Sequence, residues 1–267
     1  LQLWPLSLQE NKKVSAFKGG FPEPLTQPKA SDLWFRSYIQ TYLERDVRAI
    51  SSIKDLSTFR RFLSLAASRV GQILNRTEIA APLGLSIPAV SEWFNILEAT
   101  HQIILVPPFF ENFGKRLIKS PKIYFTDSGL TAHLLGIETE KTLARSTFLG
   151  PLFENFMASE IVKAQLNAGK RKELYYFRDR QGLEVDFVIP MGNTRLVLFE
   201  AKASRTVKPD DALPMLRLQK ATAKYQVRSF VVHLPAKSLE KFTVLHTGVK
   251  AISYEKISET LNLRGHF

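Results

Sequence analysis

The sequence GLEVDFVI at residues 182–189 is followed by LVLFEAK at residues 196–202, and this pair of segments gives the clearest structural signal in the chain. Polar and apolar residues alternate in both segments, which is the pattern of half-buried β-strands. The residues between the segments include a Gly and an Asn, which are typical of a hairpin turn. The sequence therefore predicts a β-hairpin that carries three carboxylates and one lysine on the matching faces of its two strands.

The loop of this hairpin fixes its register. A three-residue loop at residues 192–194 sets Asp186 opposite Glu200 and Glu184 opposite Lys202. Like charges placed directly opposite each other are unfavourable in a sheet, so this pattern indicates a bound cation or a catalytic task. The alternative is a surface hairpin in which Glu184 and Lys202 form a cross-strand ion pair, and the residues alone leave both interpretations open.

The D…E-x-K pattern of Asp186, Glu200 and Lys202 resembles the core of the restriction-endonuclease-like, or PD-(D/E)xK, nuclease superfamily. The resemblance implies that Asp186 and Glu200 hold Mg²⁺ (or Mn²⁺), and that Lys202 positions or activates the attacking water. Hard oxygen ligands suit Mg²⁺, and a metal beside a phosphodiester polarises it. The resemblance also implies that Glu154, on a helix expected at residues 151–163, completes the metal cluster. The alternative role of Glu154 is a favourable interaction with the N-terminus of that helix.

Length and composition set the broad class. The 267 residues suffice for two domains or one large one, and the absence of cysteine excludes a disulfide framework and a thiolate zinc site. The net charge of +12 favours a polyanionic partner such as DNA, bound with a strong salt dependence. No apolar run of about 20 residues and no secretory signal is present, so we expect a cytoplasmic protein without membrane contact.

Residues 1–30 contain four prolines and the pair Gly19-Gly20, and they predict a linker or the tail of a missing module. No P-loop sequence occurs, so neither nucleotide binding nor ATPase activity is expected from this chain. The helix expected at residues 31–47 begins with an N-cap signal at Ser31-Asp32. Its predicted apolar side consists of Leu33, Trp34, Tyr38, Tyr42 and Val47.

A second resemblance covers nearly the whole chain. The phrases GGFPE at residues 19–23, TYLERDV at 41–47, FTDSGL at 125–130 and EAK at 200–202 resemble the C-terminal region of a prokaryotic AAA-type ATPase family of poorly characterised function. The resemblance implies that an N-terminal ATPase module is absent here and that ATP binds only through that module. It leaves open a protein partner or a homo-oligomer.

Residues 56–68, 76–83 and 86–98 predict three helices, with Gly84 and the N-cap Ser86 at the turn between the last two. Strands at residues 102–106 and 116–119 would complete a winged helix. In a DNA-binding reading the third helix enters the major groove and the wing meets phosphates. The DNA-contacting residues would be Ser86, Ser91, Asn95, Lys115, Arg116 and Lys119. Against this reading, the third helix contains two Glu and neither Lys nor Arg, and winged helices also bind proteins.

Several further residues are candidates. Asp127 and His133 are expected to be a helix N-cap and a packed or exposed side chain rather than a site. Arg178 and Arg180 are candidates for phosphate contacts. Strands are predicted at residues 173–178, 228–232 and 250–254, and the histidines show no metal-ligand spacing.

These observations predict an α/β (α+β overall) protein in three parts. Residues 1–30 are the linker or tail, residues 31–145 are helical with a winged helix-turn-helix, and residues 146–267 form a restriction-endonuclease-like domain. The expected function is that of a DNA-associated region of an AAA-type ATPase and a Mg²⁺-dependent DNA endonuclease. The alternatives are a non-catalytic DNA- or protein-binding module with an inactive nuclease fold, and a structural oligomerisation region.

Overall fold

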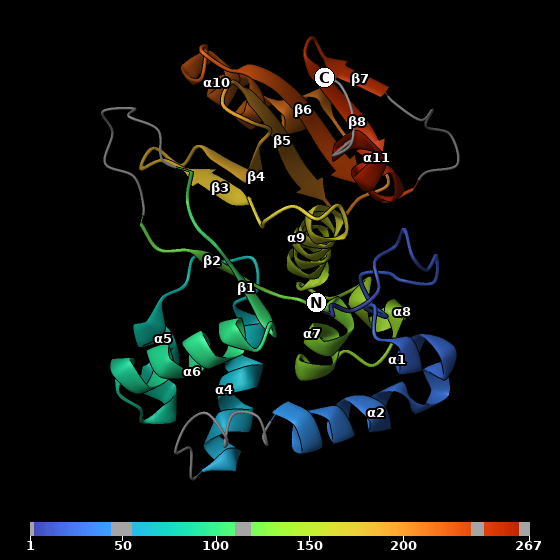
Figure 1. The fold of residues 1–267 in the computed structure, drawn as a ribbon, viewed down its shortest axis with the longest axis vertical. Coiled ribbons are helices and arrows are strands. Elements are labelled where there is room, and N and C mark those ends of the chain that lie inside the picture. Colours follow the sequence, from blue (N-terminus) through green and yellow to red (C-terminus); the bar gives the residue numbers. More distant parts are fainter. Residues whose placement is uncertain (1–2, 44–54, 110–118, 236–242, 262–267) are drawn as a thin grey trace. The chain divides into compact units, whose positions relative to one another are not determined.

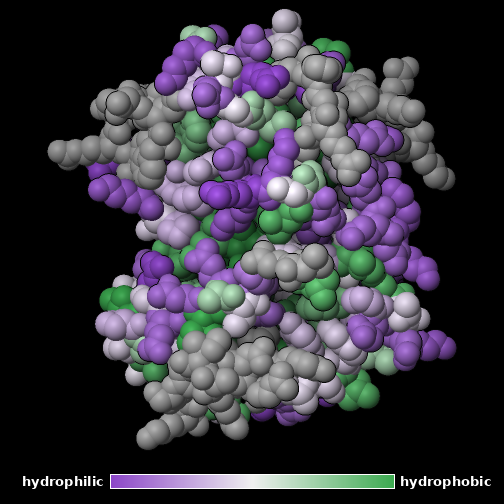
Figure 2. All heavy atoms as spheres, in the orientation of Figure 1, coloured by the Kyte–Doolittle hydropathy of each residue, from purple (hydrophilic) through white to green (hydrophobic). Residues whose placement is uncertain are grey.

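The computed structural model describes residues 3–43, 55–109, 119–235 and 243–261. It combines helices with open sheets, so the predicted α+β class is confirmed (Figure 1). Within these ranges no helix has both the length and the apolar character needed to cross a bilayer. On the face shown in Figure 2, hydrophobic side chains form separate patches among hydrophilic ones.

The chain divides into two compact units. Unit 1 consists of Leu1–Leu105 and Pro121–Ser159, and unit 2 consists of Val106–Ser120 and Glu160–Phe267. The long helix α9, Leu149–Asn167, begins in unit 1 and ends in unit 2.

Unit 1 is mainly helical. Besides the start of α9 and a 3₁₀ turn at Pro28–Ala30, its helices are α1 Pro22–Thr26, α2 Ser31–Tyr38, α4 Leu56–Ser68, α5 Arg76–Leu83, α6 Ile87–Ala99, α7 Ser128–Leu134 and α8 Glu140–Leu143. The strands β1 Ile103–Val106 and β2 Lys122–Phe125 form a two-stranded sheet. Its core includes Phe59, Phe62, Phe94 and Ile123, which are fully buried.

The three helices predicted before the wing are confirmed as α4, α5 and α6. Gly84 ends α5 in the left-handed conformation, with φ at 65°, and the Ser86 hydroxyl caps α6 by accepting the Ala89 N–H. The predicted strand 102–106 is confirmed as β1, and its partner strand is β2. The predicted second wing strand at residues 116–119 falls outside the described residues except for Lys119, which is exposed.

The apolar side predicted for residues 31–47 is wrong in part. Leu33 is 68% exposed, whereas Phe35 and Ile39 are buried. Ser31 is the first residue of α2 rather than its N-cap, because a 3₁₀ turn precedes it. The predicted Trp34 and Tyr38 do pack, half-buried, against the same core as Phe35 and Ile39. The side chain of Tyr42 and all of Val47, also predicted on this side, lie outside the described residues.

Residues 3–26, expected to belong to a linker or tail, pack within unit 1. Leu8, Val14 and Leu25 are buried there. The Leu6 N–H donates to the Gly20 carbonyl at 2.8 Å, which brings this segment back on itself.

Unit 2 contains one six-stranded sheet with the order β3-β4-β5-β6-β8-β7. The first three strands form an antiparallel meander, β5, β6 and β8 are parallel, and β7 is antiparallel to β8. The strands are β3 Tyr175–Arg178, β4 Glu184–Pro190, β5 Arg195–Lys202, β6 Gln226–His233, β7 Thr243–His246 and β8 Val249–Ser253.

One face of this sheet is covered by α10, Leu213–Ala221, which follows a 3₁₀ turn at Pro209–Ala212. Met215 and Leu218 of this helix pack into the cluster that contains Leu198 and Val231. The helix α11, Ile257–Leu261, ends the described chain.

Candidate active site

The predicted hairpin is present and its register is confirmed. The strands β4 and β5 pair antiparallel, with Phe187 opposite Phe199 and Val188 opposite Leu198. The same register, continued by one step, places Asp186 across from Glu200. Both carboxylates are buried, with 9% and 7% of each residue exposed. The two acidic residues therefore lie together at the end of β5.

Hydrogen bonds and ion pairs hold this group in place. The Ala201 N–H donates to Asp186 Oδ2 at 2.9 Å. Lys202 Nζ lies 3.0 Å from Glu200 Oε1 and 4.0 Å from Asp211 Oδ1. The structure thus brings Asp186, Glu200 and Lys202 together, and it adds Asp211 from the 3₁₀ turn before α10.

Opposing effects set the pKa of Lys202. Partial burial lowers the pKa of this ammonium group, but the charges of Glu200, Asp186 and Asp211 and the hydrogen bond to Glu200 raise it by more. The net result is a pKa above the ordinary value, so Lys202 carries a positive charge at neutral pH.

Glu184 does not pair with Lys202, as the surface-hairpin alternative would require. Its carboxylate lies 3.3 Å from Arg178 Nη1, and Arg178 is its cross-strand neighbour on β3. Lys202 pairs with Glu200 and Asp211, so the alternative Glu184–Lys202 ion pair is wrong.

His233 was not singled out by the sequence. It is the last residue of β6 and pairs in register with Lys202 across the parallel ladder, so the two side chains leave the same face. The ring is 3% exposed, and Nδ1 lies 2.7 Å from the Leu234 carbonyl oxygen. A carbonyl oxygen can only accept, so Nδ1 is the donor in this contact. The one available signal was the alternation of Ser229, Val231 and His233 along β6.

Glu154 lies in unit 1, whereas Asp186 and Glu200 lie in unit 2. Its Oε1 accepts from Lys122 Nζ at 2.9 Å and from the Tyr124 hydroxyl at 2.5 Å. Lys122 is almost completely buried, so Glu154 balances a buried charge. Because α9 begins at Leu149, Glu154 lies beyond its first turn.

Across the ranges that the structure describes, no three His, Cys, Asp or Glu side chains are grouped as metal ligands. A protein-only metal cage is therefore not present among them. Two adjacent carboxylates are still enough for a Mg²⁺ site that water and a substrate phosphate complete.

The basic candidates of unit 2 have separate environments. Arg178 is half-buried and pairs with Glu184, and Arg180 is exposed in the turn between β3 and β4. That turn is shaped by Asp179, whose carboxylate accepts from the N–H groups of Gln181 and Leu183.

The DNA-binding candidates of the predicted winged helix lie on or beside α6 and in the segment between β1 and β2. Ser86 is exposed, Asn95 is exposed, and the Ser91 hydroxyl donates to the Ile87 carbonyl. Lys115 and Arg116 lie outside the described residues. The helix α6 contains no Lys or Arg and exposes Glu92, so it offers no positive charge to a DNA groove.

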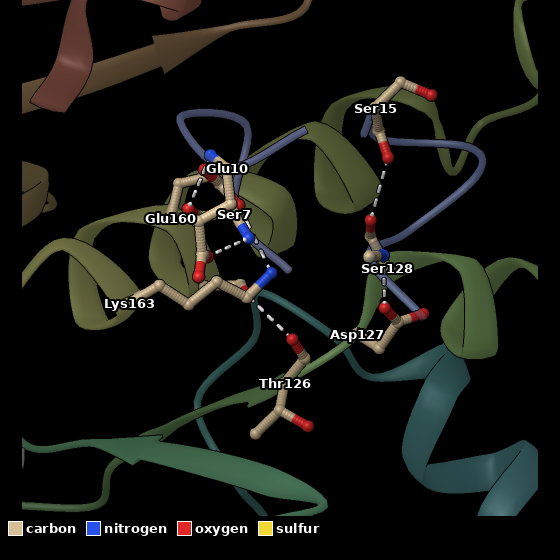
Figure 3. Close-up of polar contacts among 10 residues, drawn as sticks. Ser7, Glu10, Ser15, Thr126, Asp127, Ser128, Glu160 and Lys163 are labelled. Atoms are coloured by element: carbon tan, nitrogen blue, oxygen red, sulfur yellow. Dashed lines mark hydrogen bonds and ion pairs between the residues drawn. The ribbon is translucent and has the colours of Figure 1, made fainter. Parts of the chain in front are cut away.

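Asp127 and His133 have the structural environments that the sequence predicts. Asp127 caps α7 by accepting the Leu130 N–H at 2.8 Å, and it also accepts the Gly20 N–H. Ser128 donates to the Ser15 carbonyl at 3.3 Å beside it (Figure 3). His133 is mostly buried, and its Nδ1 lies 3.1 Å from Asp32 Oδ1.

Two family models match the chain in succession. Residues 11–141 match the domain of unknown function DUF8612. Residues 149–257 match the domain of unknown function DUF4143, a domain found in AAA-ATPase-associated proteins. The second match contains the whole predicted hairpin.

The curated relatives are also without an assigned function. The chain is 32% identical over 191 residues to the uncharacterized protein Mb2031c of Mycobacterium bovis and, with the same values, to the uncharacterized protein Rv2008c of Mycobacterium tuberculosis. The match covers 71% of this chain but 42% of each relative, so the chain spans less than half of their length. No solved structure matches the chain. The chain is thus similar in succession to two domain families of unknown function and to relatives without an assigned function.

Proposed function

We propose that unit 2 is a metal-dependent nuclease domain and that the chain is the DNA-associated C-terminal region of an AAA-type ATPase. The observation that carries the proposal is the meeting of Asp186, Glu200 and Lys202 at one end of adjacent strands. The second family match, to a domain found in AAA-ATPase-associated proteins, supports the ATPase context.

The donor set fits Mg²⁺ or Mn²⁺. Asp186 and Glu200 supply hard oxygen ligands, and Mg²⁺ is commonly held by one or two carboxylates together with water and substrate phosphate oxygens. A bound Mg²⁺ would polarise a phosphodiester and lower the pKa of water beside it. The N–H of Ala201, which donates to Asp186 Oδ2, fixes the direction of that carboxylate.

Lys202 acts in this proposal as a fixed positive charge. Its raised pKa keeps the ammonium protonated at neutral pH, so it stabilises negative charge on a phosphate rather than accepting a proton. His233 lies beside Lys202 on the neighbouring strand β6, and its Nδ1 lies 2.7 Å from the Leu234 carbonyl oxygen.

A second candidate function is a binding module with an inactive nuclease fold. It is favoured by the ion pair between Lys202 and Glu200, which neutralises one of the two carboxylates without a metal. It is also favoured by the position of Glu154, whose carboxylate pairs with Lys122 and Tyr124 in unit 1.

For unit 1 we propose a winged helix formed by α4, α5, α6, β1 and β2. The order of these elements and the capped turn at Gly84 and Ser86 support it. Ser86, Ser91 and Asn95 would face a DNA groove. The absence of Lys and Arg from α6 favours a protein partner for the same surface.

The test is cleavage of supercoiled, linear and single-stranded DNA with Mg²⁺ or Mn²⁺. Asp186→Asn and Lys202→Met should each lower the cleavage rate by at least about 100-fold, because Asp186 would hold the metal and Lys202 stabilises negative charge on the phosphate. Glu184→Gln is the matched control, since Glu184 pairs with Arg178, and it should cleave at the wild-type rate. Intact DNA in every reaction, with DNA still bound, would support the binding module instead.

A further inference from the structure

A row of three cations crosses the parallel part of the sheet in unit 2. In the β5–β6 register Arg195 is beside Gln226 and Val197 is beside Arg228. In the β6–β8 register Phe230 is beside Lys250. Residues two apart on a strand share a face, so Arg195, Arg228 and Lys250 all leave the same face of the sheet. Arg195 and Arg228 are half-buried and Lys250 is exposed.

The charges of unit 2 are separated along its strands. Residues 187–199, 212–235 and 243–254 contain no Asp or Glu. The same segments contain six basic residues, Arg195, Arg217, Lys220, Lys224, Arg228 and Lys250. The acidic residues of the sheet are instead at the start of β4 and the end of β5, around the candidate active site.

The spacing of the row suits a polymer better than a single small anion. Neighbouring strands lie about 4.8 Å apart, and each cation is displaced by two residues from the last, so successive positions are about 8 Å apart. Three charges at this spacing lie too far apart to surround one phosphate, whereas successive phosphates of a nucleic-acid backbone can each contact one of them.

An aromatic ring accompanies one of these cations. The Arg228 guanidinium lies 5.3 Å from the centroid of the Phe230 ring. The Phe230 contact restrains Arg228 on the sheet surface.

We propose that this basic row, Arg195, Arg228 and Lys250, binds the phosphodiester backbone of a nucleic-acid strand. The row is a separate surface from the candidate active site, because Arg195 and Lys202 are seven residues apart on β5, or about 23 Å. It therefore does not depend on the proposed nuclease, and its test measures binding rather than cleavage.

The test compares two triple variants of equal net charge by fluorescence anisotropy with a labelled oligonucleotide, single-stranded and duplex, over a range of salt concentrations. One variant is Arg195→Gln/Arg228→Gln/Lys250→Gln. The other, Lys12→Gln/Lys13→Gln/Lys141→Gln, removes three exposed lysines of unit 1. Each lost phosphate contact lowers the slope of log K against log salt by about 0.7 for a single strand and about 0.9 for a duplex.

We expect the basic-row variant to lose a slope of about 2 to 3, and the control variant to lose less than about 1. The substrate form with the larger loss is the one that the row binds. Equal losses of salt slope in the two variants would overturn the proposal. The proposal would also be overturned if the basic-row variant bound the oligonucleotide as wild type does and lost only its binding to phosphatidylserine vesicles, measured in parallel. If the triple variant does not fold, Lys250→Gln alone should lower the slope by about 0.7 to 0.9, and no change would overturn the proposal.

Discussion

At Lys202, burial and neighbouring charge act on the same ammonium group in opposite directions, and the charges prevail. This charged ammonium group also affects the stability of the fold. Asp186 and Glu200 are two buried carboxylates, and Lys202 is the cation that the structure supplies to them. Removing Lys202 should therefore cost stability and at the same time favour an added metal ion.

The Lys202→Met variant should be less stable than wild type at neutral pH by about 1 kcal/mol, a modest value because solvent screens the one-third-exposed ammonium. The pKa of Lys202 is raised in the folded state, so its stabilisation is fully present below the unfolded-state pKa of about 10.4 and is lost as pH rises through the folded-state pKa. Urea unfolding of both proteins at several pH values measures this difference. A difference that persists unchanged at the highest pH would contradict the ion-pair account.

His133 should make the protein less stable at acid pH, whereas the contribution of Lys202 is lost at alkaline pH. Burial lowers its pKa, and Arg36 adds to this, while the charge of Asp32 and its hydrogen bond oppose it. Because the folded-state pKa is the lower one, the unfolded chain binds more protons below about pH 6.5, and the free energy of unfolding falls as pH drops. The His133→Gln variant should lose less stability than wild type between neutral pH and about pH 5. Equal losses in the two proteins would show that His133 does not contribute.

Among the elements of unit 1, the N-terminal segment and the start of α7 meet at glycines. A Cβ on Gly19 would lie 2.2 Å from Asp127 Oδ1, and one on Gly129 would lie 2.4 Å from the Lys18 carbonyl oxygen. Asp127 accepts the Gly20 N–H at 2.6 Å across the same contact. This contact gives a physical reason for two of the phrases that suggested the ATPase-family resemblance, at residues 19–23 and 125–130.

The Gly19→Ala variant should lose about 2 to 5 kcal/mol of unfolding free energy, because it adds left-handed strain to a steric clash. Gly84→Ala is the matched control. Gly84 also has a positive φ, but a Cβ there would meet nothing within 4 Å, so it should lose only about 1 to 2 kcal/mol. Equal losses in urea unfolding would show that the contact with Asp127 does not constrain the segment.

The elements differ in how well the sequence predicts them. The β4–β5 hairpin was predictable to its register because strict alternation and the Gly192-Asn193 turn agree. The buried face of α2 was not, because Trp34 and Tyr38 stack on each other with Phe21 beside them, which leaves Leu33 exposed. The short strand β7 gave no usable pattern, since its four residues are at most half-buried.

The candidate site was predictable where one hairpin supplies the residues and less so where distant segments do. Asp186, Glu200 and Lys202 follow from local alternation and one turn. His233 and Asp211 enter the site through the β5–β6 pairing and the chain before α10, which no local pattern encodes. The buried partners of Glu154, Lys122 and Tyr124, come from a strand about 30 residues away.

On the scale of the whole molecule, the proposals separate catalysis from binding within unit 2. Asp186→Asn should lower the cleavage rate by at least about 100-fold while nucleic acid still binds. The basic-row triple variant should raise KM with kcat unchanged, because it removes contacts made equally in the ground and transition states. Steady-state kinetics on one oligonucleotide substrate separates these effects. A lower kcat in the basic-row variant at saturating substrate would show that the two surfaces act as one.

Titration of Mn²⁺ into the purified chain by calorimetry shows whether Asp186 and Glu200 form a divalent-metal site. We predict one site that is lost in Asp186→Asn and kept in Glu184→Gln. In Lys202→Met it should be kept or strengthened, since the competing ammonium is gone. Absence of Mn²⁺ binding in the wild-type chain, or binding that Asp186→Asn leaves unchanged, would contradict the proposed metal site.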